Sequence, residues 1–303
     1  MSDPSLERSW TPLHPLDLGA LLAPLRRGRG DPTMRVDADG TAWRAGTTPV
    51  GAATLAVRRD NGGTVHATGW GQGAAWALDG LPALLGADDD DSAFVPHHPL
   101  ISQVRRRMPG LRLGATRRVW DVLVPAVLEQ KVTGVEARRS WRELCWRFGE
   151  QAPGPNRLWV PPSPAAVRAI PDWEWHRAGV DQSRRRALLA AAAVAHRLES
   201  AVTLTGKAGR ELLCKVPGIG VWTAAEVAQR AWADADAVSV GDFHIPSVVG
   251  YALVGRPLDD AGMMEILAPY APQRHRAVRY VEAAGIRRPR FGPRFSPRDY
   301  REM

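Results

Sequence analysis

One aspartate, Asp242, stands where a carboxylate could do chemistry. It follows a short extended stretch and precedes an apolar run that predicts a helix, within "AVSVGDFHIPSVVGYAL". At the mouth of a cleft, such a carboxylate stabilises the positive charge that develops on a sugar when its glycosidic bond breaks, and it can orient or deprotonate the attacking water. The alternative is an ordinary helix cap, which Asp fills well, although Pro246 removes one N–H from the first turns. His244 likewise could contact a phosphate or serve a structural role.

A short glycine-rich turn, "VPGIG" at residues 216–220, lies about twenty residues earlier and leads directly into a helical pattern. Gly218 and Gly220 permit positive φ and let another chain approach closely. The turn feeds a helix N-terminus, where free N–H groups and the helix dipole favour an anion such as a DNA phosphate. That contact carries no base information. The pattern therefore predicts either a helix–hairpin–helix that grips a nucleic-acid backbone or an ordinary pair of helices joined by a glycine turn.

Helical spacing on both sides of the turn predicts the elements that position these residues. The helix–hairpin–helix is expected over residues 208–232, and further helices over 135–148 and 184–198. Another helix is predicted near residue 120, in which Pro125 should produce a kink or mark the first turn. Its apolar face has the helical repeat in Trp120, Leu123, Val124, Val127 and Leu128.

The first 95 residues have a different pattern, which predicts an α+β domain. "TMRVDADGTAWRAG" reads as strand, turn, strand, with Asp39 and Gly40 at the turn. In "TLAVRRDNGGTVHATGW", Asn61 and Gly62 supply residues that tolerate the positive φ of a hairpin turn. A helix over 73–86 is expected to break near Gly80, and the acidic run at 88–91 marks a linker or boundary. We therefore expect a mostly α fold with an N-terminal α+β domain at 1–95 and a helical region of two subdomains at 96–303.

The composition restricts the classes of function. The net charge of +8 comes from clustered arginines, which attract polyanions or simply form a solvated face. Two cysteines are too few for a disulfide framework or an iron–sulfur cluster. No run of 18 apolar residues predicts a membrane span, and the start of the sequence does not resemble a signal peptide, so a cytoplasmic protein is expected.

Together, the turn and the aspartate resemble the helix–hairpin–helix DNA glycosylase superfamily, and within it bacterial 3-methyladenine DNA glycosylase II. Residues 216–220 match the family's hairpin, Leu/Val-Pro-Gly-Ile/Val-Gly, and Asp242 matches its catalytic aspartate. The likeness covers most of the chain, including "MPGLRLGATRRVWDVLVPAVLEQKVTGVEA" and "AGVDQSRRRALLAAA". It implies a monofunctional, monomeric repair enzyme of the nucleoid that flips damaged, N-alkylated purines out of double-stranded DNA and excises them hydrolytically. No cofactor is required.

The resemblance also implies roles for residues around the hairpin. Members that nick DNA have a Schiff-base lysine where this chain has Trp222, so no strand cleavage is expected, and Trp222 could stack on the flipped base or pack in the core. The resemblance places Glu226 and Tyr280 in the base pocket. It assigns DNA contacts to Pro217, Gly218, Ile219, Gly220, Thr223 and His244. A structural Na⁺ or K⁺ would be held by the backbone carbonyls of Cys214, Val216 and Ile219.

Gln130 and Lys131 fall where the family inserts residues into the DNA. Gln130 matches a glutamine beside the vacated base position, whereas Lys131 replaces an apolar wedge and could reach a phosphate or the orphaned base. Both could equally be ordinary exposed helix residues. Two other functions stay open: a glycosylase for another lesion, such as deaminated purines, with Glu226 as the one clear acid, or a non-catalytic DNA-binding or damage-sensing protein. Asp242 distinguishes the last of these, since a pure binder needs no carboxylate near phosphates.

Overall fold

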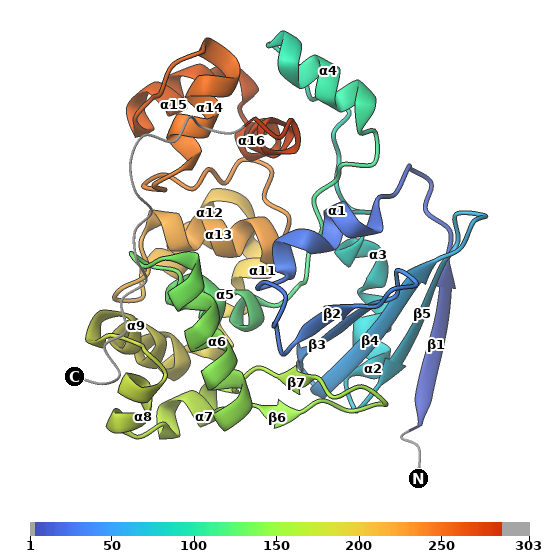
Figure 1. Ribbon diagram of the computed structural model, residues 1–303, viewed down its shortest axis with the longest axis vertical. Helices are drawn as coiled ribbons and strands as arrows, with labels where there is room; N and C mark the ends of the chain where they lie inside the picture. The colour runs from blue at the N-terminus through green and yellow to red at the C-terminus, as the bar shows by residue number, and fades with distance from the viewer. Residues whose placement is uncertain (1–3, 287–303) are drawn as a thin grey trace.

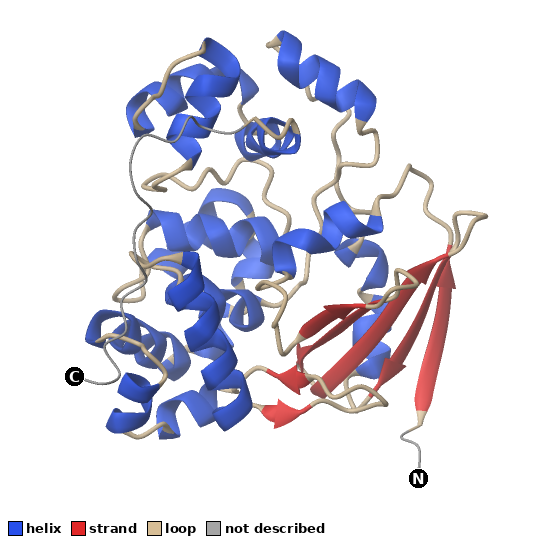
Figure 2. Cartoon of the chain, in the orientation of Figure 1, coloured by secondary structure: helices blue, strands red, loops and turns tan. Residues whose placement is uncertain are grey.

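The computed structural model describes residues 4–286, which form a sheet region and two groups of helices (Figures 1 and 2). The sheet is antiparallel, with the strand order β1-β5-β4-β3-β2. One face packs against α1 (Leu18–Leu22), α2 (Ala74–Asp79) and α3 (Leu81–Leu84), and alternating apolar residues of the strands supply the core between them. The strands are β1 (Ser5–Trp10), β2 (Met34–Val36), β3 (Ala42–Thr48), β4 (Gly51–Arg59) and β5 (Val65–Trp70).

The predicted turns and the helix break of this region are present, with one correction. Gly40 has a φ of 85° in the β2–β3 turn, as expected, and Gly80 separates α2 from α3. In the β4–β5 turn, however, the positive φ of 91° belongs to Gly63, so the prediction for Asn61 and Gly62 is wrong. The loop is longer than a two-residue turn, because the N–H of Asp60 bonds to the carbonyl of Thr64.

The middle group of helices is built around α5 (Val119–Leu128), in which every residue is buried. A helix that is apolar on all sides must be surrounded, and α6, α9 and α13 contact it. Pro125 lies inside α5, so its placement in the first turn is wrong. The other elements of this group are α6 (Gly134–Phe148), β6 (Glu150–Gln151), β7 (Trp159–Val160), α7 (Pro164–Ala169), α8 (Asp172–Arg177), α9 (Gln182–Ala193), α10 (Ala195–Leu198), α11 (Ala201–Leu204), α12 (Gly206–Cys214) and α13 (Val221–Ala231).

The third group, at the top of Figure 1, combines helices from distant parts of the sequence. α4 (Pro99–Arg107) packs against α16 (Arg274–Ala283), and Phe94 joins their shared core. The other helices of this group, α14 (Ile245–Val254) and α15 (Asp260–Leu267), precede α16 in the chain. No single described helix has the length and apolar character to cross a membrane; the bent pair Gln182–Ala193 and Ala195–Leu204 meets that test only when its two parts are taken together.

The acidic run at 88–91, expected as a linker or boundary, lies between α3 and α4 and contains a buried ion pair. Asp89 is buried, and both of its carboxylate oxygens accept hydrogen bonds from the guanidinium of Arg276, at 2.8 and 2.5 Å. Asp89 also accepts a hydrogen bond from the N–H of Leu113. Because Arg276 belongs to α16, this pair fixes α16 to the connection between the sheet and the helices.

Candidate active site

The hairpin lies between the end of α12 and the start of α13, and its two glycines serve different purposes. Gly218 has a φ of 86°, and a Cβ there would lie 2.6 Å from the Cβ of Ala187 in α9, so only glycine fits. Gly220 has a φ of −92° and a ψ of −178°, so the positive φ expected there is wrong. A Cβ on Gly220 would meet nothing within 4 Å. Gly220 is the N-cap of α13 and makes no side-chain cap, which leaves the first N–H groups of the helix open.

Other residues of the hairpin are turned inward. Pro217, Gly218 and Gly220 are exposed, but Ile219 is buried in the core of the middle helices and Thr223 is buried in α13. The side chains of Ile219 and Thr223 are therefore not available to DNA, and the predicted contacts at these two positions would have to involve the backbone. Val216 and Ile219, three residues apart, both point into the core, and Thr223 lies on the inward face of α13.

Asp242 is held in place from two sides, by the start of α14 and by Trp222. One carboxylate oxygen, Oδ1, accepts hydrogen bonds from the N–H groups of His244 at 2.7 Å and Ile245 at 2.9 Å, which caps α14. The other, Oδ2, accepts a hydrogen bond from the indole Nε1 of Trp222 at 3.1 Å. Among residues 4–286, no arginine or lysine forms an ion pair with Asp242, so its negative charge is oriented but not neutralised by a cation.

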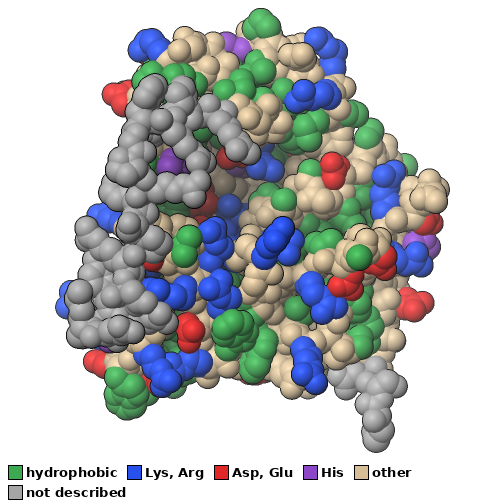
Figure 3. Space-filling view, viewed as in Figure 1, with side chains coloured by type: hydrophobic (Ala, Val, Ile, Leu, Met, Phe, Trp, Pro, Cys, Tyr) green, Lys and Arg blue, Asp and Glu red, His purple; other side chains and the backbone are tan. Residues whose placement is uncertain are grey.

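Trp222 and Asp242 line a pocket of about 280 Å³ where the three regions meet. α1 and the segment after it supply apolar side chains, whereas α13 and α16 supply most of the polar ones. Figure 3 shows a hollow beneath the upper helices, with Lys and Arg side chains spread over the middle of the same face. The polar and charged side chains of the lining are those of Arg112, Glu129, Trp222, Glu226, Gln229, Arg230, Ser239, Asp242, His275, Arg279 and Glu282.

Glu226 lies in the pocket, as predicted, but its carboxylate is already engaged. One oxygen pairs with Arg230 at 2.8 Å, and the other accepts a hydrogen bond from the hydroxyl of Ser239 at 2.5 Å. The amide of Gln229 donates to the same hydroxyl at 2.9 Å. This network occupies both carboxylate oxygens and gives Glu226 a structural role in the pocket wall.

Tyr280 does not line the pocket, and its prediction as a pocket residue is wrong. The side chain is buried with its ring 5.4 Å from that of Phe94. The face of α16 that lines the pocket instead has the helical repeat i, i+3, i+4, i+7. Its members are His275, Val278, Arg279 and Glu282. Sequence reasoning missed this face, although the repeat itself was visible in "HRAVRYVE".

Gln130 and Lys131 lie at the turn between α5 and α6, beside the hairpin. The amide of Gln130 donates hydrogen bonds to the carbonyl of Gly218 at 3.0 Å and to the hydroxyl of Thr223 at 2.8 Å. Gln130 thus ties this turn to the hairpin. Lys131 is exposed, with a left-handed φ of 54°. His244 is exposed beside Asp242, with its ring against that of Phe243.

His275 is the one imidazole in the pocket lining. Burial, together with the guanidinium groups of Arg279, Arg230 and Arg276, holds the pKa of His275 well below its usual range. The folded protein therefore carries this imidazole in its neutral form at pH 7.

This neutral histidine should make the protein less stable in mild acid. Below about pH 6.5 the unfolded chain binds a proton at this position and the folded chain does not, so the free energy of unfolding falls by up to about 1.4 kcal/mol per pH unit. We expect urea unfolding at pH 7.0 and 5.5 to show a smaller loss of stability for His275→Asn than for the parent. Other histidines contribute equally to both proteins. An equal loss in the two would contradict a neutral His275.

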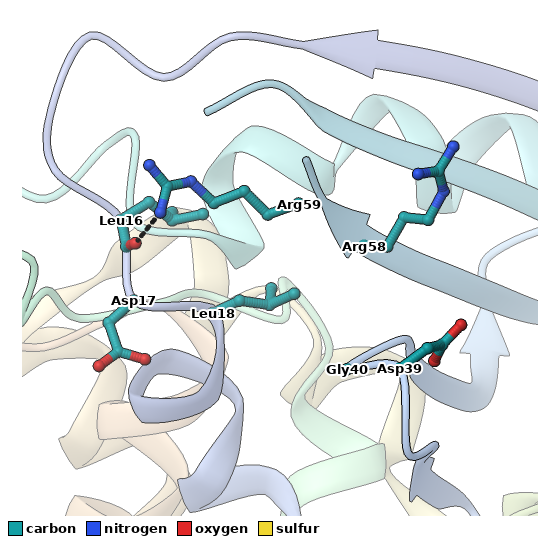
Figure 4. Close-up of a pocket in the computed structure, with 7 residues that line it drawn as sticks. All are labelled: Leu16, Asp17, Leu18, Asp39, Gly40, Arg58 and Arg59. Atoms are coloured by element: carbon teal, nitrogen blue, oxygen red, sulfur yellow. Dashed lines mark hydrogen bonds between the residues drawn. The ribbon is translucent and has the colours of Figure 1, made fainter. Parts of the chain in front are cut away.

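A second hollow, of about 420 Å³, lies on the sheet region at a distance from the hairpin residues (Figure 4). Two of its polar side chains have structural partners. Arg59 donates to the carbonyl of Leu16, and Asp17 accepts from the N–H of Ala20 at the start of α1. None of the site residues predicted from the sequence lines it, and we place the candidate site in the pocket beside Asp242.

The fold of this chain is similar to that of several solved structures. A 3-methyladenine DNA glycosylase from Archaeoglobus fulgidus superposes with a TM-score of 0.75 over 90% of this chain and 97% of its own, at 16% sequence identity. The chain has the helix–hairpin–helix DNA glycosylase fold. An 8-oxoguanine glycosylase/lyase from Clostridium acetobutylicum, in complex with double-stranded DNA, superposes with a TM-score of 0.69 at 10% identity, over 93% of this chain and 98% of that one. No protein-family model matches the sequence, and no curated protein matches it.

Proposed function

We propose that this chain is a monofunctional DNA glycosylase that excises a flipped, damaged purine from double-stranded DNA. The observation that carries the proposal is the Asp242 carboxylate, oriented by Trp222 at the edge of a pocket and not ion-paired within the described chain. The hairpin and the open N-terminus of α13 lie next to it. Two of the solved structures that share the fold are described as DNA glycosylases, which supports the same class of reaction here.

The proposed reaction follows from the placement of these groups. The flipped base enters the pocket at a cost of a few kcal/mol, which is lowest for a damaged pair. As the glycosidic bond breaks, positive charge develops on the deoxyribose, and the carboxylate of Asp242 stabilises it. The same group orients or deprotonates the attacking water. A non-catalytic damage sensor would not need this oriented charge.

Binding to the DNA backbone is proposed to use the exposed face of the hairpin. The open N–H groups at the start of α13 suit a phosphate. Gly220→Asp keeps an allowed backbone, fills empty space and adds a good N-cap, but it places a negative charge where the phosphate would lie. We expect it to weaken binding to damaged and undamaged duplexes alike, by about tenfold or more at low salt.

Gly220→Asn is the matched control, because it adds a cap of the same size without a charge. It should retain most of the affinity, as measured by fluorescence anisotropy at several salt concentrations. Equal affinities for the Asp and Asn variants would contradict a phosphate contact at Gly220.

Hydrolysis without strand cleavage is proposed because the pocket lining contains no lysine. The chain has three lysines, Lys131, Lys207 and Lys215, and Trp222 occupies the position at which the bifunctional relatives have theirs. Borohydride added during turnover should therefore trap no covalent protein–DNA adduct. An adduct that disappears in Lys215→Arg or Lys131→Arg would show that one of these amines attacks the sugar.

We also propose that the hairpin holds a structural Na⁺ or K⁺. The carbonyls of Cys214, Val216 and Ile219 lie at the end of α12 and in the turn, where backbone oxygens lack helical partners. Of these, the carbonyl of Val216 also accepts the N–H of Ile219. A bound Na⁺ or K⁺ would hold the turn in shape and needs no part in the chemistry. We further propose that the protein acts as a monomer.

The test of the proposed function is base release from DNA carrying several classes of damage. Alkylated, oxidised and deaminated DNA are each incubated with the protein, and the free bases are separated by chromatography. Release of at least one modified purine supports the proposal. Binding to DNA with no release from any substrate would favour a damage sensor instead.

A further inference from the structure

His275 is a buried polar side chain without a partner. It is 7% exposed and lines the pocket, yet no residue between 4 and 286 forms a hydrogen bond with either of its ring nitrogens. Its polar neighbours differ from it in this respect, because Glu226, Gln229 and Ser239 bond to one another. Because His275 lines the pocket and has no partner among the described residues, its ring nitrogens are free to bond to a ligand there.

The groups around His275 determine what this ligand can be. A neutral imidazole offers one N–H donor and one acceptor nitrogen. Val278, one turn along α16, adds an apolar wall, and Trp222 and Asp242 lie at another side of the same pocket. This combination suits a flat heterocycle whose edge carries both a donor and an acceptor.

The charges in the lining argue against a cationic base. Three of the four carboxylates are already paired with arginine: Glu226 with Arg230 at 2.8 Å, Glu282 with Arg279 at 2.7 Å, and Glu129 with Arg27 at 3.1 Å. The fourth, Asp242, serves the sugar in the proposed reaction. The lining contains Trp222 but no other Trp, Tyr or Phe. This pocket therefore lacks the several aromatic faces that surround a cation in an aromatic cage.

We propose that His275 reads the edge of the flipped base through hydrogen bonds, and that the preferred base is an uncharged purine with a donor and an acceptor on that edge. Deaminated and oxidised purines belong to this class. This inference rests on the proposed function and narrows it. It departs from the preference for N-alkylated, positively charged purines that the sequence resemblance implies.

Single-turnover base release tests the inference directly. Three duplexes differ only in one purine: hypoxanthine, 8-oxoguanine or the cationic 7-methylguanine. Each rate is divided by the uncatalysed rate of the same duplex, because a cationic base leaves more easily. The inference predicts a larger acceleration for at least one of the uncharged bases than for 7-methylguanine. A larger acceleration for 7-methylguanine than for both would overturn it.

Three variants separate a reading role from a structural one. His275→Phe keeps a ring but loses both hydrogen bonds, and it should slow release of the uncharged base about tenfold while changing release of 7-methylguanine little. His275→Asn retains a donor and an acceptor and should recover part of the rate. His196→Phe, on the exposed side of α10, is the matched control and should keep the parental rate. Equal rates for the parent and His275→Phe on the uncharged base would overturn the inference.

A binding measurement tests the role of His275 without relying on base release. The ring signals of His275, assigned by NMR through the His275→Asn variant, are followed while a free nucleoside is added: deoxyinosine, 8-oxodeoxyguanosine or 7-methylguanosine, whose base keeps its positive charge while the sugar is attached. The inference predicts shifts with a nucleoside of an uncharged base at concentrations where the cationic 7-methylguanosine produces none. Shifts without any base release from DNA would contradict the proposed function alone. Absence of a shift with both uncharged bases would overturn the inference, whatever the activity.

Discussion

Asp242→Asn is expected to slow base release by about 10²–10⁴-fold while leaving the fold and duplex binding unchanged. The amide has nearly the same shape, and its oxygen can still accept the hydrogen bonds from the N–H groups of His244 and Ile245. Its NH2 group cannot accept the hydrogen bond from the indole of Trp222, so that one contact is lost. The amide lacks the negative charge that the developing positive charge on the sugar requires. Single-turnover base release measures the loss, and thermal melting with duplex titration checks that nothing else changed.

Asp259→Asn is the matched control for this substitution. Asp259 also caps a helix, since its carboxylate accepts a hydrogen bond from the N–H of Gly262 at the start of α15, but it does not line the pocket. It should release bases at the parental rate. If Asp242→Asn also kept that rate in a folded protein, Asp242 would be a helix cap and nothing more.

Asp89→Ala is expected to lower the free energy of unfolding by about 3–5 kcal/mol. It removes one partner of a buried pair and leaves the guanidinium of Arg276, which is fully buried, without its counter-charge. The wall of the pocket formed by α16 should loosen with it, because Arg276 follows His275 in that helix. Urea unfolding measures the loss.

Two further variants make the Asp89 measurement specific. Asp88→Ala changes an exposed neighbour in the same acidic run and should alter the stability by no more than about 0.5 kcal/mol. Arg276→Met removes the other partner and leaves Asp89 unpaired, so a loss comparable to that of Asp89→Ala is expected. Similar small effects for Asp88→Ala and Asp89→Ala would contradict a buried structural pair.

Local patterns predicted the parts of the site that depend on local structure. The spacing of apolar residues placed α12 and α13 on either side of the glycine turn, and the special backbone of Gly218 followed from its residue type. The expectation that Asp242 lies beside a helix start was also sound, because capping is a local preference. The mostly α fold with an N-terminal α+β region is likewise confirmed.

Tertiary packing decided the parts that sequence patterns missed. Tyr280 was placed in the pocket by the family resemblance, but the rotation of α16 is set by its packing against α4, which turns His275 to the pocket and Tyr280 to the core. The pairing of Asp89 with Arg276 joins residues far apart in the chain, so the acidic run indicated a linker or boundary but could not indicate this ion pair. Gly220 has a backbone conformation that any residue can adopt. What distinguishes it is the open space beside its Cα, which depends on the tertiary structure and not on the local sequence.

The most direct test of the central claim uses one duplex with a single damaged purine, labelled at one end of the damaged strand. Mass spectrometry detects the free base, and denaturing gels resolve the strand before and after alkali. The account predicts release of the free base with a strand that stays intact until alkali cleaves it, and loss of both signals in Asp242→Asn. Tight binding of duplexes that carry alkylated, oxidised or deaminated purines, with no free base from any of them, would contradict it.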